Sequence, residues 1–153
     1  MSTPTVPAAV AAILAGGSLD DALVATMNHF HCQVGTVHLL REGVLRLSAH
    51  RGLPPPIVQI VDAVPIGKGI AGLAAERLEP VSLCNLQTDT SGQARPAAKT
   101  TGMEGSVAVP MLTPRGELRG VLGIATAEAH DWQPEETGVL LAIGTVLANR
   151  FSA

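Results

Sequence analysis

Two histidines in the first half of the chain carry the side chains best suited to acid–base chemistry, because imidazole titrates near neutral pH. His38 and His50 lie in two segments that alternate apolar and polar residues, and Ser48 precedes His50 by two positions. The preferred strand register places all three on one sheet face, but no Ser, Cys or Asp is placed to complete a nucleophile–base pair. The functional interpretation is a polar sheet face that lines a pocket. The structural alternative is a polar face that is exposed or covered by a loop.

A glycine-rich segment over residues 66–77 is the second candidate for ligand chemistry. Gly67, Gly69 and Gly72 surround Lys68, as in a phosphate-binding loop, but no Ser or Thr follows the Gly-Lys pair and no clear buried strand precedes it. The segment is therefore interpreted as a tight turn that packs the following helix closely on a sheet. The free N–H groups at the start of that helix could still orient an anionic ligand group.

The thiols and the other early histidines do not have the spacing of a reactive or metal-binding site. Cys32 and Cys84 make no disulfide framework and are expected to be small buried apolar residues. His29 and His31 cannot share a helix face, because residues two apart point in different directions. We predict no catalytic residue and no metal site, and the sequence names no cofactor.

Polar residues gather in a long connection over residues 86–104 and at its borders. They are Asn85, Asp89, Arg95 and Lys99, and Ser106 opens the next strand. Loops held by a rigid scaffold often carry binding residues, so this connection is a candidate lid over a polar ligand. The alternative for each residue is a solvated surface loop.

Hydrophobic periodicity predicts the elements that position these residues. We expect helices over 8–15, 19–30, 57–62, 70–77 and 134–151, a short helix near 96–101, and strands over 35–41, 45–51, 80–84, 105–112 and 118–127. The order describes an α+β domain. The terminal helices should cover one sheet face, and the middle helix and long loop the other, with a ligand pocket between sheet and loop.

The hairpin formed by the first two strands decides which residues face that pocket. A three-residue loop, Glu42-Gly43-Val44, is preferred, with Gly43 at a positive φ. That register places Val37 and Leu39 on one face with Leu45, Leu47 and Ala49, and leaves Thr36, His38, Arg46, Ser48 and His50 on the other.

Composition limits the class of protein. The 153 residues suit one domain, and with 46% hydrophobic and 15% charged residues the chain can bury an aliphatic core. The net charge of −3 and the scattered basic residues argue against nucleic-acid binding. No apolar run is long enough to span a membrane and no signal peptide is evident, so we expect a cytoplasmic protein without a membrane partner.

Three segments resemble the GAF domain family. The first is residues 66–75 followed by Glu79-Pro80-Val81, the second is residues 102–112, and the third is residues 120–124, with Trp132 and Pro134-Glu135-Glu136 after it. Their order over residues 19–151 resembles GAF modules of bacterial regulators and signalling kinases. The resemblance implies an antiparallel sheet of five or six strands between terminal helices and a layer formed by the middle helix and loop.

Family members bind cyclic nucleotides, tetrapyrroles, small metabolites or ions, and the resemblance implies one of these. The cyclic-nucleotide signature is missing, because Phe occurs only at positions 30 and 151. Bilin-binding members have a Cys followed by His, whereas Asn85 follows Cys84. Members that reduce free methionine sulfoxide have a Cys where this chain has Ala71, and the long loop carries none either.

The sequence therefore predicts a cytoplasmic, non-catalytic bacterial sensor that binds an unidentified small molecule. Its candidate ligand-binding residues are His38, Ser48, His50, Ile70, Leu73, Cys84, Asn85, Asp89, Arg95, Lys99 and Ser106. The alternatives are a free methionine sulfoxide reductase and a purely structural dimerisation module. We expect a tail and short helix over 1–17, one domain over 18–153, a homodimer through the terminal helices, and a signalling partner in trans.

Overall fold

The computed structural model describes residues 6–94 and 96–151, apart from the side chains of Ala9, Ala12, Ile13, Leu14 and Ala97. The elements follow in the order α1 (Ala8–Gly16), α2 (Leu19–Phe30), β1 (Val34–Arg41), β2 (Val44–Arg51), α3 (Pro55–Val61), β3 (Ala63–Pro65), α4 (Gly69–Arg77), β4 (Val81–Leu83), α5 (Pro96–Lys99), β5 (Gly105–Leu112), β6 (Leu118–Thr126) and α6 (Pro134–Phe151). The expected elements are all found, and β3 is an addition to them.

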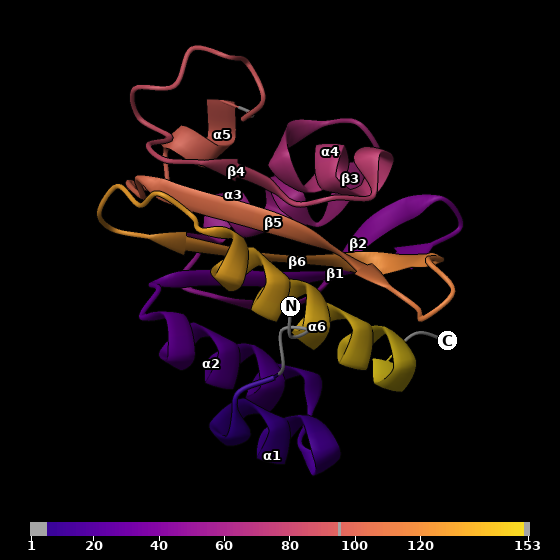
Figure 1. The fold of residues 1–153 in the computed structure, drawn as a ribbon. Helices are drawn as coiled ribbons and strands as arrows, with labels where there is room; N and C mark the ends of the chain where they lie inside the picture. Colours follow the sequence, from indigo (N-terminus) through magenta and orange to yellow (C-terminus); the bar gives the residue numbers. More distant parts are fainter. Residues whose placement is uncertain (1–5, 95, 152–153) are drawn as a thin grey trace.

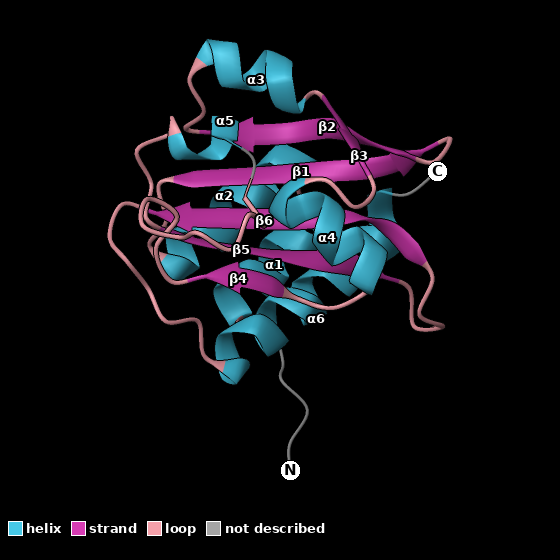
Figure 2. Cartoon of the chain, turned by 90° about the horizontal axis from the view of Figure 1, so that it is seen from above, coloured by secondary structure: helices cyan, strands magenta, loops and turns pink. Residues whose placement is uncertain are grey.

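One six-stranded antiparallel sheet organises the molecule, with the strand order β3-β2-β1-β6-β5-β4. Figure 1 shows α1, α2 and α6 on one face and α3, α4 and α5 on the other, and Figure 2 views the second layer from above. The predicted α+β fold and its layers are confirmed. Both edge strands have only three residues, which limits pairing with another sheet.

The helix α2 begins where the local sequence predicts it. The Ser18 hydroxyl accepts a hydrogen bond from the Asp21 amide at 3.0 Å, and the Asp21 carboxylate accepts one from the Ser18 amide at 3.2 Å. This capping box satisfies two N–H groups that a helix start leaves free. It fixes the register in which Leu23 and Met27 face the sheet.

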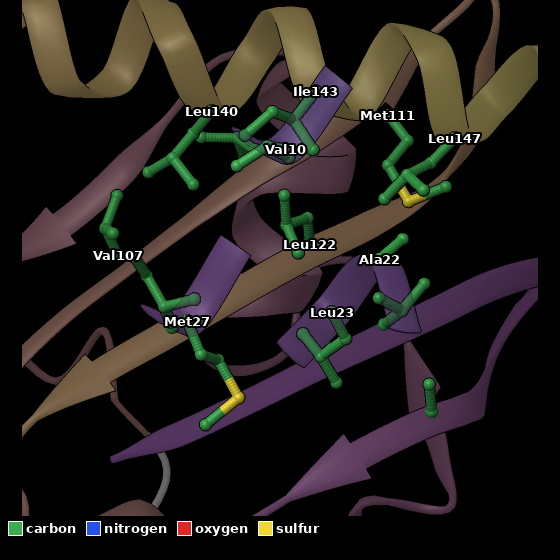
Figure 3. Packing of buried hydrophobic residues seen from close by; sticks show 14 of the residues in the cluster. Val10, Ala22, Leu23, Met27, Val107, Met111, Leu122, Leu140, Ile143 and Leu147 are labelled. Carbon is green, nitrogen blue, oxygen red and sulfur yellow. The ribbon is translucent and has the colours of Figure 1, made fainter. Parts of the chain in front are cut away.

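The main core lies between the sheet and the layer formed by α1, α2 and α6 (Figure 3). Leu140, Ile143 and Leu147 follow one another by three and four residues on α6 and are at most 1% exposed. They pack in one cluster with Leu122 of β6 and Val10 of α1. Helix α1 therefore shares the core with the residues that follow it, and the expected domain boundary near residue 17 stays a prediction.

The predicted register of the β1–β2 hairpin is wrong. Arg41 pairs with Val44, so the turn has two residues, Glu42 and Gly43, both with positive φ. This is the two-residue turn whose twist matches that of the strands. It turns Leu45 and Leu47 toward the α4 side of the sheet, with His38 and Leu40, rather than toward α2 as predicted.

A β-bulge then reverses the alternation halfway along β2. The register shifts between Val37 and His38, so that Val37 pairs with Ala49 and His38 pairs with Leu47. The extra residue, Ser48, is exposed, and its hydroxyl donates to the Arg46 carbonyl oxygen at 3.1 Å. A bulge inserts one residue into one strand, and this one returns Ala49 to the α2 side.

Candidate functional site

A partly open cavity of about 150 Å³ lies between the sheet and the layer formed by α3, α4 and α5. Two rows of residues across three neighbouring strands form its floor. One row is Val34, Ala125 and Ser106, and the other is Thr36, Gly123 and Ala108. The members of each row come from β1, β6 and β5 and point to the same face, because they are directly paired.

Small residues on the two inner strands create this hollow. Gly123 lies at its centre, flanked by Ala108 on β5 and by Ala125 two positions along β6. A Cβ atom built on Gly123 would lie 3.0 Å from Oγ1 of Thr36, so the glycine brings the backbone close to that hydroxyl. Larger residues at these positions would fill the space that a ligand could occupy.

Apolar side chains from three segments form most of the cavity walls. The lining residues are Leu53, Ile57, Val61 and Val64 around α3, residues 68–71 at the start of α4, and Leu86, Ala98 and Thr101 of the long connection. Lys68 is exposed at the mouth. An apolar concave site with few polar groups is the usual form of a small-molecule site.

The glycine turn before α4 forms the expected tight structure. Its ends are closed by hydrogen bonds from the Gly67 amide to the Gly72 carbonyl oxygen, at 2.8 Å, and from the Lys68 amide to the Pro65 carbonyl oxygen, at 3.2 Å. Gly67 and Gly69 both have positive φ. The turn thus places the first residues of α4 beside the cavity by backbone geometry.

His38 is the most buried polar side chain of the cavity lining, with 3% of its surface exposed. Its Nε2 lies 2.8 Å from the carbonyl oxygen of Val61 and must carry the proton, because a carbonyl only accepts. Burial lowers the pKa of His38 below its ordinary 6.5, against the opposing effects of the Val61 hydrogen bond and the Asp62 charge. The neutral ring then leaves Nδ1 as an acceptor, for which the described residues provide no hydrogen-bond partner.

This lowered pKa predicts a loss of stability in mild acid. As the pH falls through 6.5, the unfolded chain binds a proton at position 38 more readily than the folded protein, so the free energy of unfolding falls. A His38→Gln variant cannot titrate there and should lose less stability than the wild type between about pH 8 and about pH 5.5. Urea unfolding at several pH values measures the difference. Parallel pH profiles for the two proteins would contradict the assignment.

Three of the predicted binding residues meet at the cavity: His38, Ile70 and Ser106. His50 is half-buried on the same sheet face, opposite Thr36, but it is not among the described residues that line the cavity. Ser48 is exposed at the bulge and is not among these lining residues either. A binding role for all of them stays a prediction.

The predicted residues of the long connection mostly hold that segment together. Lys99 Nζ donates to the Asp89 carbonyl oxygen at 3.1 Å, and the Asp89 carboxylate accepts from the Ser91 amide and hydroxyl. Asn85 Oδ1 accepts from the Gln87 amide at 2.9 Å. These contacts hold the loop that brings Leu86, Ala98 and Thr101 to the cavity. Arg95 lies outside the described residues.

The other two predicted residues are not among the described residues that line the cavity. Leu73 is half-buried and packs against the cluster around Ile70, and Cys84 is exposed just after β4. The sequence places Thr36 on the predicted polar face without naming it a binding residue, and it does not select Gly123 or Thr101. The available signal was the pair of small residues two apart in the strand, Gly123 and Ala125, which leaves a hollow on one face.

The two thiols have contrasting environments. Cys32 is buried in the α2-side core, and this burial raises its pKa to about 12. Cys84 is exposed, contrary to the expectation that both are buried. A thiol reagent should therefore modify one cysteine per folded chain rapidly and both after denaturation. The fast reaction should disappear in a Cys84→Ser variant, and equally fast reaction of both thiols would show that the α2-side core opens readily.

The comparisons with known proteins agree on the fold. The family model described as GAF domain matches residues 18–151. A search of curated proteins gives no match. No helix in the described part of the chain is both long enough and apolar enough to cross a membrane.

Several solved structures share the fold at low sequence identity. The GAF domain of a phosphoenolpyruvate-protein phosphotransferase from Coxiella burnetii is 22% identical, with a TM-score of 0.75 over 92% of this chain and 86% of the other. The corresponding domain from Acinetobacter is 20% identical, with a TM-score of 0.74 and the same coverage. The free methionine-R-sulfoxide reductase from Neisseria meningitidis, solved with its substrate, is 16% identical, with a TM-score of 0.75 over 93% of this chain and 83% of that one.

Proposed function

The chain belongs to the GAF domain family, and on that premise we propose that it is a cytoplasmic, non-catalytic sensor domain that binds a small molecule in the cavity above Gly123. The observation that carries the proposal is the cavity itself. Its floor consists largely of small or apolar residues, its walls come from three separate segments, and a buried histidine lies at its side. This combination suits binding better than chemistry, because no nucleophile–base pair has been identified among the lining residues.

A ligand bound in this cavity would contact segments of two different layers of the fold. The walls belong to α3, to the start of α4 and to the long connection, and the floor belongs to the sheet that α1, α2 and α6 cover from the other side. A ligand that contacts both wall and floor would favour one arrangement of these layers over another. A partner protein in trans would then read the change at the terminal helices.

The dimer expected at the terminal helices is part of this proposal. Ala8, Ala11 and Ala15 form an exposed stripe on α1, and Val139, Leu141 and Val146 of α6 are half-buried. Apolar surface of this kind on two helices of the same layer supports pairing with a second copy.

The test compares ligand occupancy in two matched variants. Ala108 and Ala49 are both buried strand residues, but Ala108 faces the cavity and Ala49 faces the α2-side core. Ala108→Val should occupy the cavity with little loss of stability, whereas Ala49→Val should overpack the core at a cost of about 1–3 kcal/mol. Urea unfolding measures both effects.

Native mass spectrometry of protein purified from its own cells then reports the ligand. The wild type and Ala49→Val should carry a mass excess that vanishes on denaturation, and Ala108→Val should lack it. A wild-type mass equal to that of the polypeptide would contradict a tightly held ligand. An excess that persists in Ala108→Val would place the ligand elsewhere.

The reductase alternative has weaker support in the structure. A likeness at 16% identity shows the fold alone. Thiol–disulfide chemistry needs an accessible thiolate and a resolving partner, whereas Cys32 is held in the core with a raised pKa. Methionine sulfoxide reduction that is lost in Cys84→Ser would favour the enzyme, and a fully active double cysteine variant would exclude a thiol mechanism.

A further inference from the structure

The polar groups and size of the cavity define a class of ligand, an inference that rests on the proposed binding function. We propose that the cavity takes a compact molecule, about the size of a benzene ring, that carries an O–H or N–H donor for Nδ1 of His38. The ring of the ligand would lie over Gly123, and its donor would point toward β1.

The volume sets the size of the ligand. An apolar protein cavity of about 150 Å³ holds one benzene molecule, and the cavity here has about 150 Å³. A planar cofactor with several fused rings would fit only if α3 or the long connection moved away. The small residues Gly123, Ala108 and Ala125 leave a flat apolar floor on which one ring can rest.

The tautomer of His38 sets the hydrogen-bonding character of the ligand. Its Nε2 donates to Val61, so Nδ1 is the ring nitrogen left without a hydrogen-bond partner among the described residues, and it can only accept. A buried acceptor without a partner is unfavourable, and a ligand that donates to it relieves this cost, whereas a ligand that only accepts does not. Nδ1 is covered in the structure, so binding as proposed requires the imidazole to rotate about its terminal side-chain torsion, which is broad in histidine.

Two hydroxyl groups extend the polar part of the site along the floor. Thr36 and Ser106 lie in adjacent rows on opposite sides of β6, and both line the cavity. A hydroxyl can donate or accept, so these groups tolerate a second polar substituent of either kind. His38 is the lining group whose fixed tautomer discriminates between donors and acceptors.

Three ring-sized probes test the inference by calorimetry: phenol, which donates; toluene, which has no polar group; and benzoate, which only accepts when ionised. We expect phenol to bind about three- to tenfold more tightly than toluene, as one added hydrogen bond provides, and benzoate to bind more weakly than phenol. In protein labelled with ¹⁵N-histidine, phenol should shift the Nδ1 resonance of His38, and toluene should shift it much less.

A matched pair of variants assigns the effect to one side chain. His38→Phe should abolish the preference for phenol over toluene, whereas His50→Phe, the same change just outside the cavity lining, should retain it. If His38→Phe fails to fold, the shift of the His38 Nδ1 resonance in the wild type still shows whether phenol donates to this nitrogen. Equal binding of phenol and toluene, or tighter binding of benzoate than of phenol, would contradict the proposed donor to His38 but not the binding function of the cavity. Failure of all three probes to bind would contradict the proposed ligand class. The native mass spectrum of protein purified from its own cells then tests the binding function separately.

Discussion

Replacing Gly72 with alanine is expected to destabilise the protein by about 2 kcal/mol or more, although alanine is the better helix former. A Cβ atom on Gly72 would lie 2.6 Å from the carbonyl oxygen of Pro65 and 3.1 Å from the Gly67 nitrogen. Both are backbone atoms of the glycine turn, so no flexible side chain can move aside. Helix propensity alone favours alanine over glycine by about 1 kcal/mol. The clash is expected to cost more than this gain, because α4 and the turn would have to move apart to make room for the methyl group.

Gly16→Ala is the matched control for this change. Gly16 is the last residue of α1, and a Cβ atom built there meets no atom within 4 Å. The free energy of unfolding of the Gly16→Ala variant should differ from that of the wild type by about 0.5 kcal/mol or less. Urea denaturation of both variants and the wild type measures the contrast. A Gly72→Ala protein as stable as the wild type would mean that the turn can shift without cost.

The second large effect is expected in α6, where Leu140→Ala should cost about 2–5 kcal/mol. Leu140 is 1% exposed, and Figure 3 shows its side chain directed from α6 toward the core. Removing it leaves a cavity that the surrounding residues fill only in part. The next residue, Leu141, is half-buried. Leu141→Ala makes the same change in helix propensity and should cost about 1 kcal/mol.

Chemical denaturation at two protein concentrations separates packing within the chain from packing between chains. The loss caused by Leu140→Ala should not depend on concentration. If Leu141 lies in the proposed dimer, the loss in Leu141→Ala should grow with concentration, because association stabilises only the folded wild type. Equal losses in the two variants at low concentration would contradict the burial of α6 described here.

Much of this architecture could be predicted from sequence because short-range rules determine it. The capping box at Ser18 and Asp21, the apolar spacing of α6, and the positive-φ glycines of the turn before α4 act through neighbours in the chain. The resemblance to the GAF domain family then predicted how these elements are arranged in space. The two helical layers and five of the six strands were predicted in this way, and only the three-residue strand β3 was not expected.

The tertiary structure decided which side chains share the cavity. The face on which Leu45 and Leu47 lie depends on a two-residue turn, and Ala49 returns to the other face only through the bulge at Ser48. A bulge depends on pairing with β1 and leaves no periodic signal in β2 alone. The predicted three-residue loop shifts the register by one position and so groups Ser48 with His38, whereas the observed two-residue turn pairs His38 with Leu47.

The hollow over Gly123 depends on three strands that are distant in sequence. Sequence periodicity placed His38, Ile70 and Ser106 on candidate elements, but only the order β1-β6-β5 sets Thr36, Gly123 and Ala108 in one row. The same packing brings the Val61 carbonyl to His38 and thereby fixes its tautomer. Local sequence thus determined the elements, whereas long-range pairing determined the cavity, because a cavity exists only where residues from separate strands and helices meet.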